Sequence, residues 1–221
     1  MSIKSLAERF AELQAERDRT WPPEQLAKNA NQRRVLVERH DPAALPKAGD
    51  RVEPFTLVDV DGIHVPSTEI LANGPAVLVF FRFGGCPACN LALPYYNETL
   101  YPALSAAGIP LLAISVQIPV DKGPTERHGL NFPTYADPGY ALSRQLSLSF
   151  LPEDQPVPEP GKPWFGATLG TNSYEIAQPA VIVLNADHTI RFIDISPDWL
   201  VRTEAAAVLA HLPETAQAQA A

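Results

Sequence analysis

The two cysteines of the chain, Cys86 and Cys89, are separated only by Pro87 and Ala88. Pro87 suits the first position of a helix, because the N–H that proline lacks would have no partner there. Cys86 would then be the N-cap residue, where free backbone amides and the helix dipole stabilise a thiolate and lower its pKa. Cys89 would follow one turn later, within reach of a sulfenic acid or a mixed disulfide on Cys86. The spacing therefore predicts a redox-active cysteine pair.

Two other uses of a cysteine pair fit this sequence less well. A zinc site needs about four ligands, and the chain has no second cysteine pair. A structural disulfide across two residues would close a very small loop and add little stability. We therefore expect neither a metal nor another cofactor. The five histidines, which show no ligand spacing, are His40, His64, His128, His188 and His211.

The segments on either side of the cysteine pair are expected to be a buried strand and a helix. Residues 76–81 form a continuous run of aliphatic and aromatic side chains, which is typical of a strand buried on both faces. Two glycines at residues 84–85 lead into the pair. The helix is expected over residues 87–107, with a kink or an interruption at Pro94 and at Pro102.

The remaining order of elements predicts an α/β fold. We expect a second buried strand at residues 110–116, hairpins at 55–65 and 180–193, and a closing helix at 202–212. Five prolines within residues 152–163 predict an extended loop. This order predicts a mixed β-sheet with helices on both faces.

The N-terminal part of the chain is predicted to be a helical extension of this domain. Residues 5–19 and 23–38 have helical patterns, and prolines and a glycine in residues 41–50 mark a linker. We therefore expect an extension over residues 1–44 and a main domain over residues 45–221. The apolar stripe along the first of these helices consists of Leu6, Phe10 and Leu13.

Composition excludes several classes of protein. The chain has 221 residues and a net charge of −8, which argues against nucleic acid or an anionic membrane surface as a partner. No segment approaches the roughly 20 apolar residues of a spanning helix. The charged N-terminus lacks the apolar core of a secretory signal, so the cytoplasm is the expected location.

Beyond the cysteine pair, the sequence resembles a known group of proteins. Residues 77–89 look like the active-site strand and turn of thioredoxin-fold proteins, and Pro94 matches their helix-kinking proline. Over about residues 45–212 the order of motifs resembles the peroxiredoxin-like branch of the alkyl hydroperoxide reductase/thiol-specific antioxidant family. The matching stretches are Ala48–Arg51, Phe55–Leu57, Arg82–Asn90, Ala113–Ser115, Asp137–Pro138, Pro179–Asn185, Ile190–Phe192 and Ser196–Asp198.

The resemblance implies roles for individual residues. Cys86 and Cys89 would be the catalytic residues. Arg82, Gly85 and Pro179 would contact the substrate, with Arg82 lowering the thiolate pKa or holding a substrate anion. Pro179 would belong to a cis-proline loop that lies against the cysteine pair. An exposed or ion-paired Arg82 and an ordinary trans Pro179 are the alternatives.

The sequence also departs from both patterns. Peroxiredoxins have a threonine or serine at the position of Phe83, a proline at that of Val79 and their catalytic arginine at that of Pro179. Thioredoxins have a tryptophan at the position of Gly85 and a buried carboxylate at that of Phe80. These differences keep more than one thiol chemistry open.

The resemblance implies a thiol-dependent peroxidase that reduces hydroperoxides through a Cys86/Cys89 dithiol–disulfide cycle. A thioredoxin- or glutaredoxin-type protein would restore the thiols, and a homodimer is compatible with this function. The alternative is a thiol–disulfide oxidoreductase that acts on protein or small-molecule disulfides without peroxidase activity. A third hypothesis is a non-catalytic binding module in which the N-terminal apolar stripe faces a partner protein.

Overall fold

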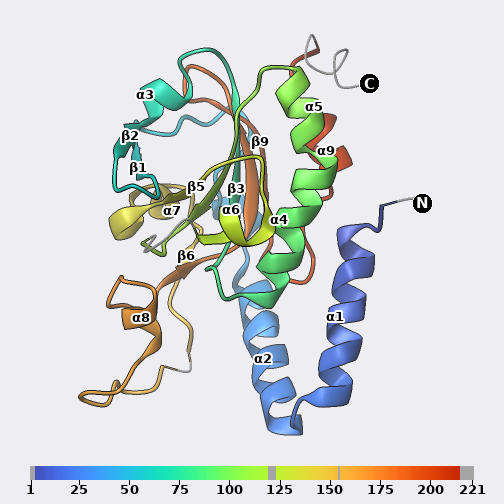
Figure 1. Cartoon of the computed structure of the whole chain (residues 1–221), viewed down its shortest axis with the longest axis vertical. Helices are drawn as coiled ribbons and strands as arrows, with labels where there is room; N and C mark the ends of the chain where they lie inside the picture. The colour runs from blue at the N-terminus through green and yellow to red at the C-terminus, as the bar shows by residue number, and fades with distance from the viewer. Residues whose placement is uncertain (1–2, 119–122, 154, 215–221) are drawn as a thin grey trace.

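The structure of the protein is a computed structural model, and it describes residues 3–118, 123–153 and 155–214. Its centre is a seven-stranded sheet with the order β2-β1-β5-β4-β3-β8-β9 (Figure 1). Strands β3, β4 and β5 are parallel to one another, whereas β8 and β9 run antiparallel beside β3. The predicted α/β fold with a mixed sheet is confirmed. The strands of this sheet are β1 (Thr56–Val58), β2 (His64–Pro66), β3 (Ala76–Phe80), β4 (Leu111–Ser115), β5 (Thr134–Ala136), β8 (Ala180–Leu184) and β9 (Ile190–Ile195).

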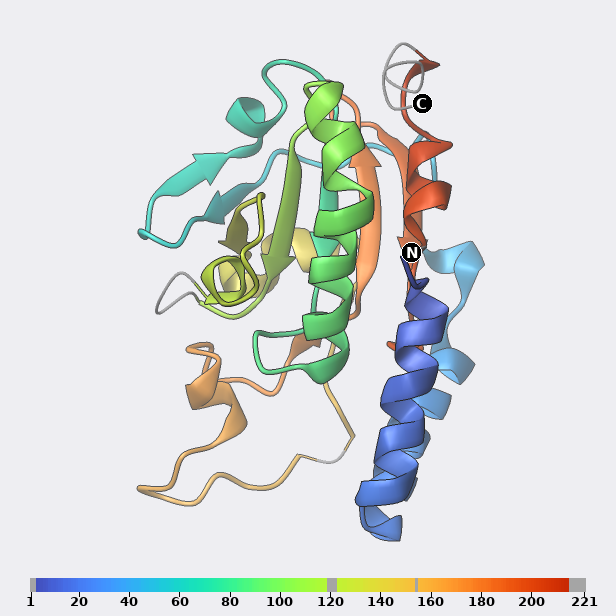
Figure 2. The same ribbon diagram turned by 45° about the vertical axis from the view of Figure 1, so that its right-hand side comes forward.

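Helices cover both faces of the sheet. Alternate side chains of β3, β4 and β8 point into two separate apolar clusters, one on each face. Helices α4, α5 and α9 cover one face, and α7 lies over the other (Figure 2). The helices are α1 (Leu6–Thr20), α2 (Pro23–Arg39), α3 (Ser67–Ile70), α4 (Pro87–Thr99), α5 (Tyr101–Ala106), α6 (Gly123–His128), α7 (Ala141–Gln145), α8 (Phe165–Thr168) and α9 (Ala205–Leu209), with 3₁₀ turns at Pro42–Ala44 and Pro138–Tyr140.

The expected helix over residues 87–107 is interrupted near the second of its two prolines. Pro94 lies inside α4, and the helix ends at Thr99. Leu100 separates α4 from α5, and Pro102 occupies the first turn of α5. A proline in this turn needs no N–H partner, so the chain starts a new helix there instead of continuing the old one.

Helices α1 and α2 form a hairpin that extends beyond the sheet (Figure 1). Ser5 and Glu8 form a capping box at the start of α1. Leu6 and Phe10 are buried in the apolar cluster that also contains the cysteine pair, and Leu13 packs against it. The apolar stripe of the first helix therefore packs on its own chain, which removes the main support for a binding module that presents this stripe to a partner.

Some expected elements differ from the structure. The closing helix is shorter than residues 202–212, because α9 spans only Ala205–Leu209. The proline-rich segment at 152–163 is irregular, as expected, where the structure describes it. A small two-stranded sheet of β6 (Ser149–Phe150) and β7 (Ile176–Ala177) was not expected. Within the described residues, no helix is long and apolar enough to span a membrane.

Candidate active site around Cys86 and Cys89

The turn between β3 and α4 places Cys86 at the start of a helix. The backbone N–H of Cys86 donates to the carbonyl of Phe83 at 3.1 Å, which closes the turn. Cys86 is the N-cap residue of α4, and its Sγ accepts a hydrogen bond from the backbone N–H of Cys89 at 3.4 Å. The predicted N-cap position is confirmed, so one free amide of the helix already points at this sulfur.

The two sulfur atoms lie 2.8 Å apart and share a hydrogen bond. Both cysteines are free thiols, and both are buried, with 3% of Cys86 and none of Cys89 exposed. Neighbouring Gly85 and Pro87 are exposed. The sulfurs therefore lie directly beneath the surface, close enough to exchange a proton or to become bonded after one of them is oxidised.

Arg202 contacts the cysteine pair, although no feature of the sequence indicated this residue. Its Nη2 donates to Sγ of Cys89 at 3.4 Å, and the backbone N–H of Arg82 donates to the same sulfur at 3.4 Å. Burial opposes ionisation of Cys89. The hydrogen bond between the two sulfurs and the positive charge of Arg202 outweigh burial and hold the pKa of Cys89 well below its ordinary value.

Cys86 shows the opposite shift. The hydrogen bond to Cys89, burial and the negative charge of Cys89 raise the pKa of Cys86 well above its ordinary value. The expected fall in the pKa of Cys86 is therefore wrong, because the neighbouring Cys89 and burial outweigh the N-cap amide. The pair therefore loses its first proton more readily than its second, and the charge left by the first ionisation lies mainly on Cys89.

The segment between β9 and α9 holds Arg202 in position. Nε of Arg202 donates to the carbonyl of Trp199 at 2.9 Å. The carbonyl of the next residue, Thr203, accepts from the buried hydroxyl of Tyr96 on α4 at 2.8 Å. Asp198 lies in the same segment and accepts two hydrogen bonds of 2.6 Å from Arg33 on α2. Arg202 is therefore fixed both by the helix that carries the cysteines and by the N-terminal hairpin.

Arg82 is buried, unlike an ordinary surface arginine. Its guanidinium lies 4.1 Å from the ring centre of Trp199, and its Nη2 donates to Oε1 of Gln32 at 3.1 Å. The carbonyl of Arg82 accepts from the hydroxyl of Ser115 on β4. The side chain thus lies between the sheet and α2, next to the cysteine pair and without an ion-pair partner among the described residues.

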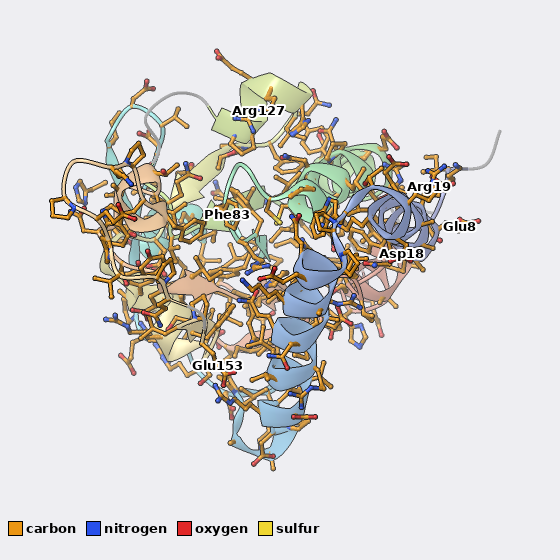
Figure 3. All side chains as sticks on the ribbon, turned by 90° about the horizontal axis from the view of Figure 1, so that it is seen from below. Glu8, Asp18, Arg19, Phe83, Arg127 and Glu153 are labelled. Atoms are coloured by element: carbon orange, nitrogen blue, oxygen red, sulfur yellow. The ribbon has the colours of Figure 1, made fainter. Side chains whose placement is uncertain are left out.

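The other two expected substrate residues lie in different settings. Gly85 is exposed beside Cys86, and as a glycine it has no side chain that could cover the sulfur of Cys86. Pro179 is buried, and it lines a small cavity together with Arg202. The expected cis-proline loop is wrong for this chain, because every peptide bond that the structure describes is trans. Phe83 lies near the centre of the lower end of the molecule, with Arg127 on α6 to one side (Figure 3).

A metal site is not evident around the pair. The part of the chain that the structure describes contains no group of three or more His, Cys, Asp or Glu side chains arranged to hold a metal ion. The chemistry available to the site is that of two thiols and the guanidinium groups beside them.

The fold and the thiol pair at the start of α4 define a thioredoxin-like protein of the peroxiredoxin type. Residues 48–193 match the AhpC/TSA family. The chain therefore belongs to the AhpC/TSA family, which makes it an oxidoreductase of the thiol-dependent peroxidase class. A comparison with curated protein sequences gave no match.

Solved structures show the same fold at low sequence identity. Peroxidoxin BcpB from Mycobacterium tuberculosis is 18% identical with a TM-score of 0.55, and the match covers 79% of this chain and 96% of that chain. Reduced Prx3 from Vibrio vulnificus in complex with H₂O₂ is 20% identical with a TM-score of 0.52, covering 67% and 86%. Peroxiredoxin 5 from Alvinella pompejana is 17% identical with a TM-score of 0.55, covering 75% and 96%.

Proposed function

We propose that the protein reduces hydroperoxides through a dithiol–disulfide cycle of Cys86 and Cys89. The observation that carries this proposal is the 2.8 Å contact between the two sulfurs at the N-terminus of α4, with Arg202 bound to one of them. Once the pair has lost one proton, it supplies a nucleophile on one sulfur and a proton donor on the other.

The cycle starts with the singly protonated pair. Because the negative charge lies mainly on Cys89, the proton of Cys86 first passes to Cys89 across the 2.8 Å contact between the two sulfurs. The thiolate of Cys86 attacks an oxygen of the hydroperoxide, so that an S–O bond forms while the O–O bond breaks. The proton on Cys89 passes to the departing alkoxide, which leaves as the alcohol. The thiolate of Cys89, stabilised by Arg202, then attacks the sulfenic acid of Cys86. A disulfide forms, and hydroxide leaves and takes a proton to become water.

The disulfide has to be reduced before the next turnover. A thioredoxin- or glutaredoxin-type protein is the proposed reductant, since its thiolate attacks one sulfur and its second thiol releases the mixed disulfide. The exposed Gly85 and Pro87 beside Cys86 favour attack at this sulfur. A cytoplasmic location fits this cycle, because a reducing compartment keeps such pairs reduced.

Stopped-flow kinetics with hydrogen peroxide and an organic hydroperoxide test the proposal. The Cys86→Ser variant should lose peroxide consumption, whereas Cys89→Ser should react once and accumulate a sulfenic acid that mass spectrometry detects. If Cys86→Ser consumes peroxide as fast as the wild-type protein, the assignment of the nucleophile is wrong. If Cys89→Ser is the inactive variant, the roles of the two sulfurs are exchanged.

A second candidate is thiol–disulfide exchange without peroxidase activity. It is favoured by Phe83, Val79 and Pro179, which stand where peroxiredoxins have the groups that bind a peroxide. This function predicts reduction of insulin or glutathione disulfide by the protein, with no consumption of hydroperoxide. A mixed disulfide trapped on Cys86 in the Cys89→Ser variant and identified by mass spectrometry would support it.

We also propose the division into a helical extension, residues 1–44, and a main domain, residues 45–221. The hairpin of α1 and α2 lies outside the sheet, which supports this division (Figure 1). Limited proteolysis should cut first within residues 41–50 and leave the main domain intact. Cleavage first inside the main domain would contradict the proposed boundary.

A further inference from the structure

The hairpin of α1 and α2 packs over the buried cysteine pair. Helix α1 lies against α4 (Figure 2). Leu6, Phe10 and Leu36 of the hairpin are buried in the apolar cluster that contains both cysteines. Cys89 is fully buried, and only 3% of Cys86 is exposed. A thiol reductant has to reach one of the two sulfurs to break a disulfide, so the disulfide of the proposed cycle has to become more accessible before it is reduced.

Arg17 of this hairpin is a buried cation without an acidic partner among the residues that the structure describes. Its side chain stacks on Trp21, with the guanidinium 4.7 Å from the ring centre. Only 4% of Arg17 is exposed, and its Nε and Nη1 atoms are buried without a hydrogen-bond acceptor. An unpaired buried charge is costly. Arg17 therefore opposes closure of the hairpin unless a negative charge lies nearby.

The ionised cysteine pair supplies this negative charge. Cys86, when ionised, attracts Arg17, whereas Arg33 repels it. The nearby carboxylate of Asp198 already forms an ion pair with Arg33. The charge of the cysteine pair is therefore what compensates Arg17 within the described part of the chain.

Two further guanidinium groups depend on the same charge. Arg202 donates to Sγ of Cys89 at 3.4 Å, and Arg82 interacts electrostatically with Cys86 and Cys89. Neither arginine forms an ion pair with a carboxylate among the described residues. One negative charge thus lies among three guanidinium groups, and its loss leaves all three without a counter-charge.

Oxidation to the disulfide removes this charge. The singly ionised pair gives two electrons to the hydroperoxide, so that the S–S bond forms and the O–O bond breaks. With one added proton, the products are the alcohol and water. The pair passes from one negative charge to none. Because the sulfurs already lie 2.8 Å apart, forming the disulfide changes the charge of the site more than the fold of α4.

The other contacts that hold the hairpin are the same in both oxidation states. In addition to the ion pair of α2 described above, Arg9 pairs with Glu98, and Glu204 accepts a hydrogen bond from the backbone N–H of Ala7. Ion pairs near the surface contribute little to stability. The charge of the cysteine pair therefore shifts the balance between a closed and a loosened hairpin.

We propose that the α1–α2 hairpin is a redox-sensitive cover, which Arg17 holds closed over the ionised cysteine pair and which loosens when the disulfide forms. Loosening uncovers the disulfide for a thiol reductant, and reduction restores the charge and closes the hairpin. The inference rests on the proposed dithiol–disulfide cycle, because that cycle produces the disulfide to which the hairpin responds.

Hydrogen exchange of α1, followed by mass spectrometry, tests the proposal. The reduced protein is compared with protein oxidised by diamide, which forms the disulfide without a peroxide, at a pH above the first ionisation of the pair. Exchange in α1 should be faster by about tenfold or more in the disulfide form. Exchange in β3, at the centre of the sheet, should stay the same. Equal exchange of α1 in the two forms would overturn the inference.

Matched variants show whether Arg17 senses the charge. Arg17→Met replaces the buried charge with an apolar side chain, so α1 should exchange at the same rate in both oxidation states. Arg19→Met, on the same helix, should keep the wild-type difference, since Arg19 is exposed and pairs with Glu16. Thermal unfolding shows whether each variant is folded. If folded Arg17→Met keeps the wild-type difference, the inference is wrong.

The double variant Cys86→Ser/Cys89→Ser separates the loss of charge from the formation of the S–S bond. Its two hydroxyl groups are neutral and form no disulfide. Exchange of α1 in this variant should be as fast as in the oxidised wild-type protein. Exchange as slow as in the reduced wild-type protein would show that loss of the charge does not loosen the hairpin, which refutes the proposed cause.

Reduction by dithiothreitol shows whether loosening uncovers the disulfide. The hairpin of oxidised Arg17→Met should stay closed, so this variant should be reduced more slowly than wild type by about tenfold or more. Arg19→Met should be reduced at the wild-type rate. Equal rates for Arg17→Met and wild type would refute the role of the hairpin as a cover.

The two proposals fail in different ways. If diamide forms the disulfide and loosens the hairpin but hydroperoxides do not oxidise the pair, the peroxidase cycle is wrong and the cover stands. If hydroperoxide reduction depends on Cys86 but α1 exchanges equally in both oxidation states, the peroxidase cycle stands and the cover is refuted.

Discussion

Replacing Arg202 with methionine should raise the pH at which the cysteine pair first ionises. In the structure, Nη2 of Arg202 lies 3.4 Å from Sγ of Cys89. Burial raises the pKa of Cys89, but hydrogen bonds and the charge of Arg202 outweigh burial and lower it. At this separation and an effective dielectric constant of about 20, the Coulomb attraction is on the order of 5 kcal/mol before desolvation is counted. An opposite charge at such distances typically shifts a pKa by about 1–3 units, or roughly 1.4–4 kcal/mol.

The rate of alkylation by iodoacetamide, measured from pH 4 to 10, reports this ionisation. We expect a low apparent pKa in the wild-type protein and a value about 1–3 units higher in Arg202→Met. Arg202→Lys keeps the charge and should give an intermediate value. Thermal unfolding is needed as a second measurement, because Arg202 also lies over the ring of Phe10.

Arg144→Met is the matched control for this experiment. Arg144 forms an exposed ion pair with Glu175 and has no contact with either sulfur, so its loss should leave the alkylation profile unchanged. If Arg202→Met is folded and shows the wild-type profile, Arg202 does not stabilise the thiolate. The proposed role of Cys89 as the charged partner would then be refuted.

Three further predictions concern the surroundings of the site. Asp198→Asn removes the ion pair with Arg33 and should cost about 1–3 kcal/mol of unfolding free energy in urea titrations; an unchanged midpoint would contradict this. Burial raises the pKa of Asp198, but the hydrogen bond from Arg33 outweighs burial and lowers this pKa. Ionised Asp198 therefore stabilises the fold at pH values above the pKa of about 3.9 in the unfolded chain. This stabilisation is lost as the pH falls through the lower pKa of the folded protein. The stability difference between wild type and Asp198→Asn should therefore shrink below about pH 4. Phe10→Ala should cost about 3–5 kcal/mol, because the ring is buried, and should speed alkylation of Cys86; a rate equal to that of wild type would show that α1 does not shield the pair.

The sequence was sufficient for the parts of the fold that depend on local patterns. The apolar run of β3, the helix start at Pro87 and the interruption near Pro102 each follow from residue types at short spacing. The position of Cys86 as an N-cap residue follows in the same way. The family resemblance added the thioredoxin-like fold, which short-range patterns do not define.

The sequence was not sufficient for the groups that tune the pair. Arg202 lies 113 residues after Cys89, outside any helix and in no motif, so only the folded chain shows their contact. Arg17 lies outside the apolar stripe of the first helix, so only the folded chain shows that it is buried. Pro179 was expected in a cis peptide because of its place before a strand, yet its peptide bond is trans.

The site combines residues that lie far apart in the sequence. Arg17 approaches Cys86 from the first helix, whereas Arg202 reaches Cys89 from a segment near residue 200. During synthesis the chain grows from its N-terminus, so the two cysteines leave the ribosome long before Arg202 does. Until then the nascent thiols lack their guanidinium partner and should ionise like those of unfolded peptides. The ribosome-bound chain would therefore acquire its reactivity only after Arg202 has emerged.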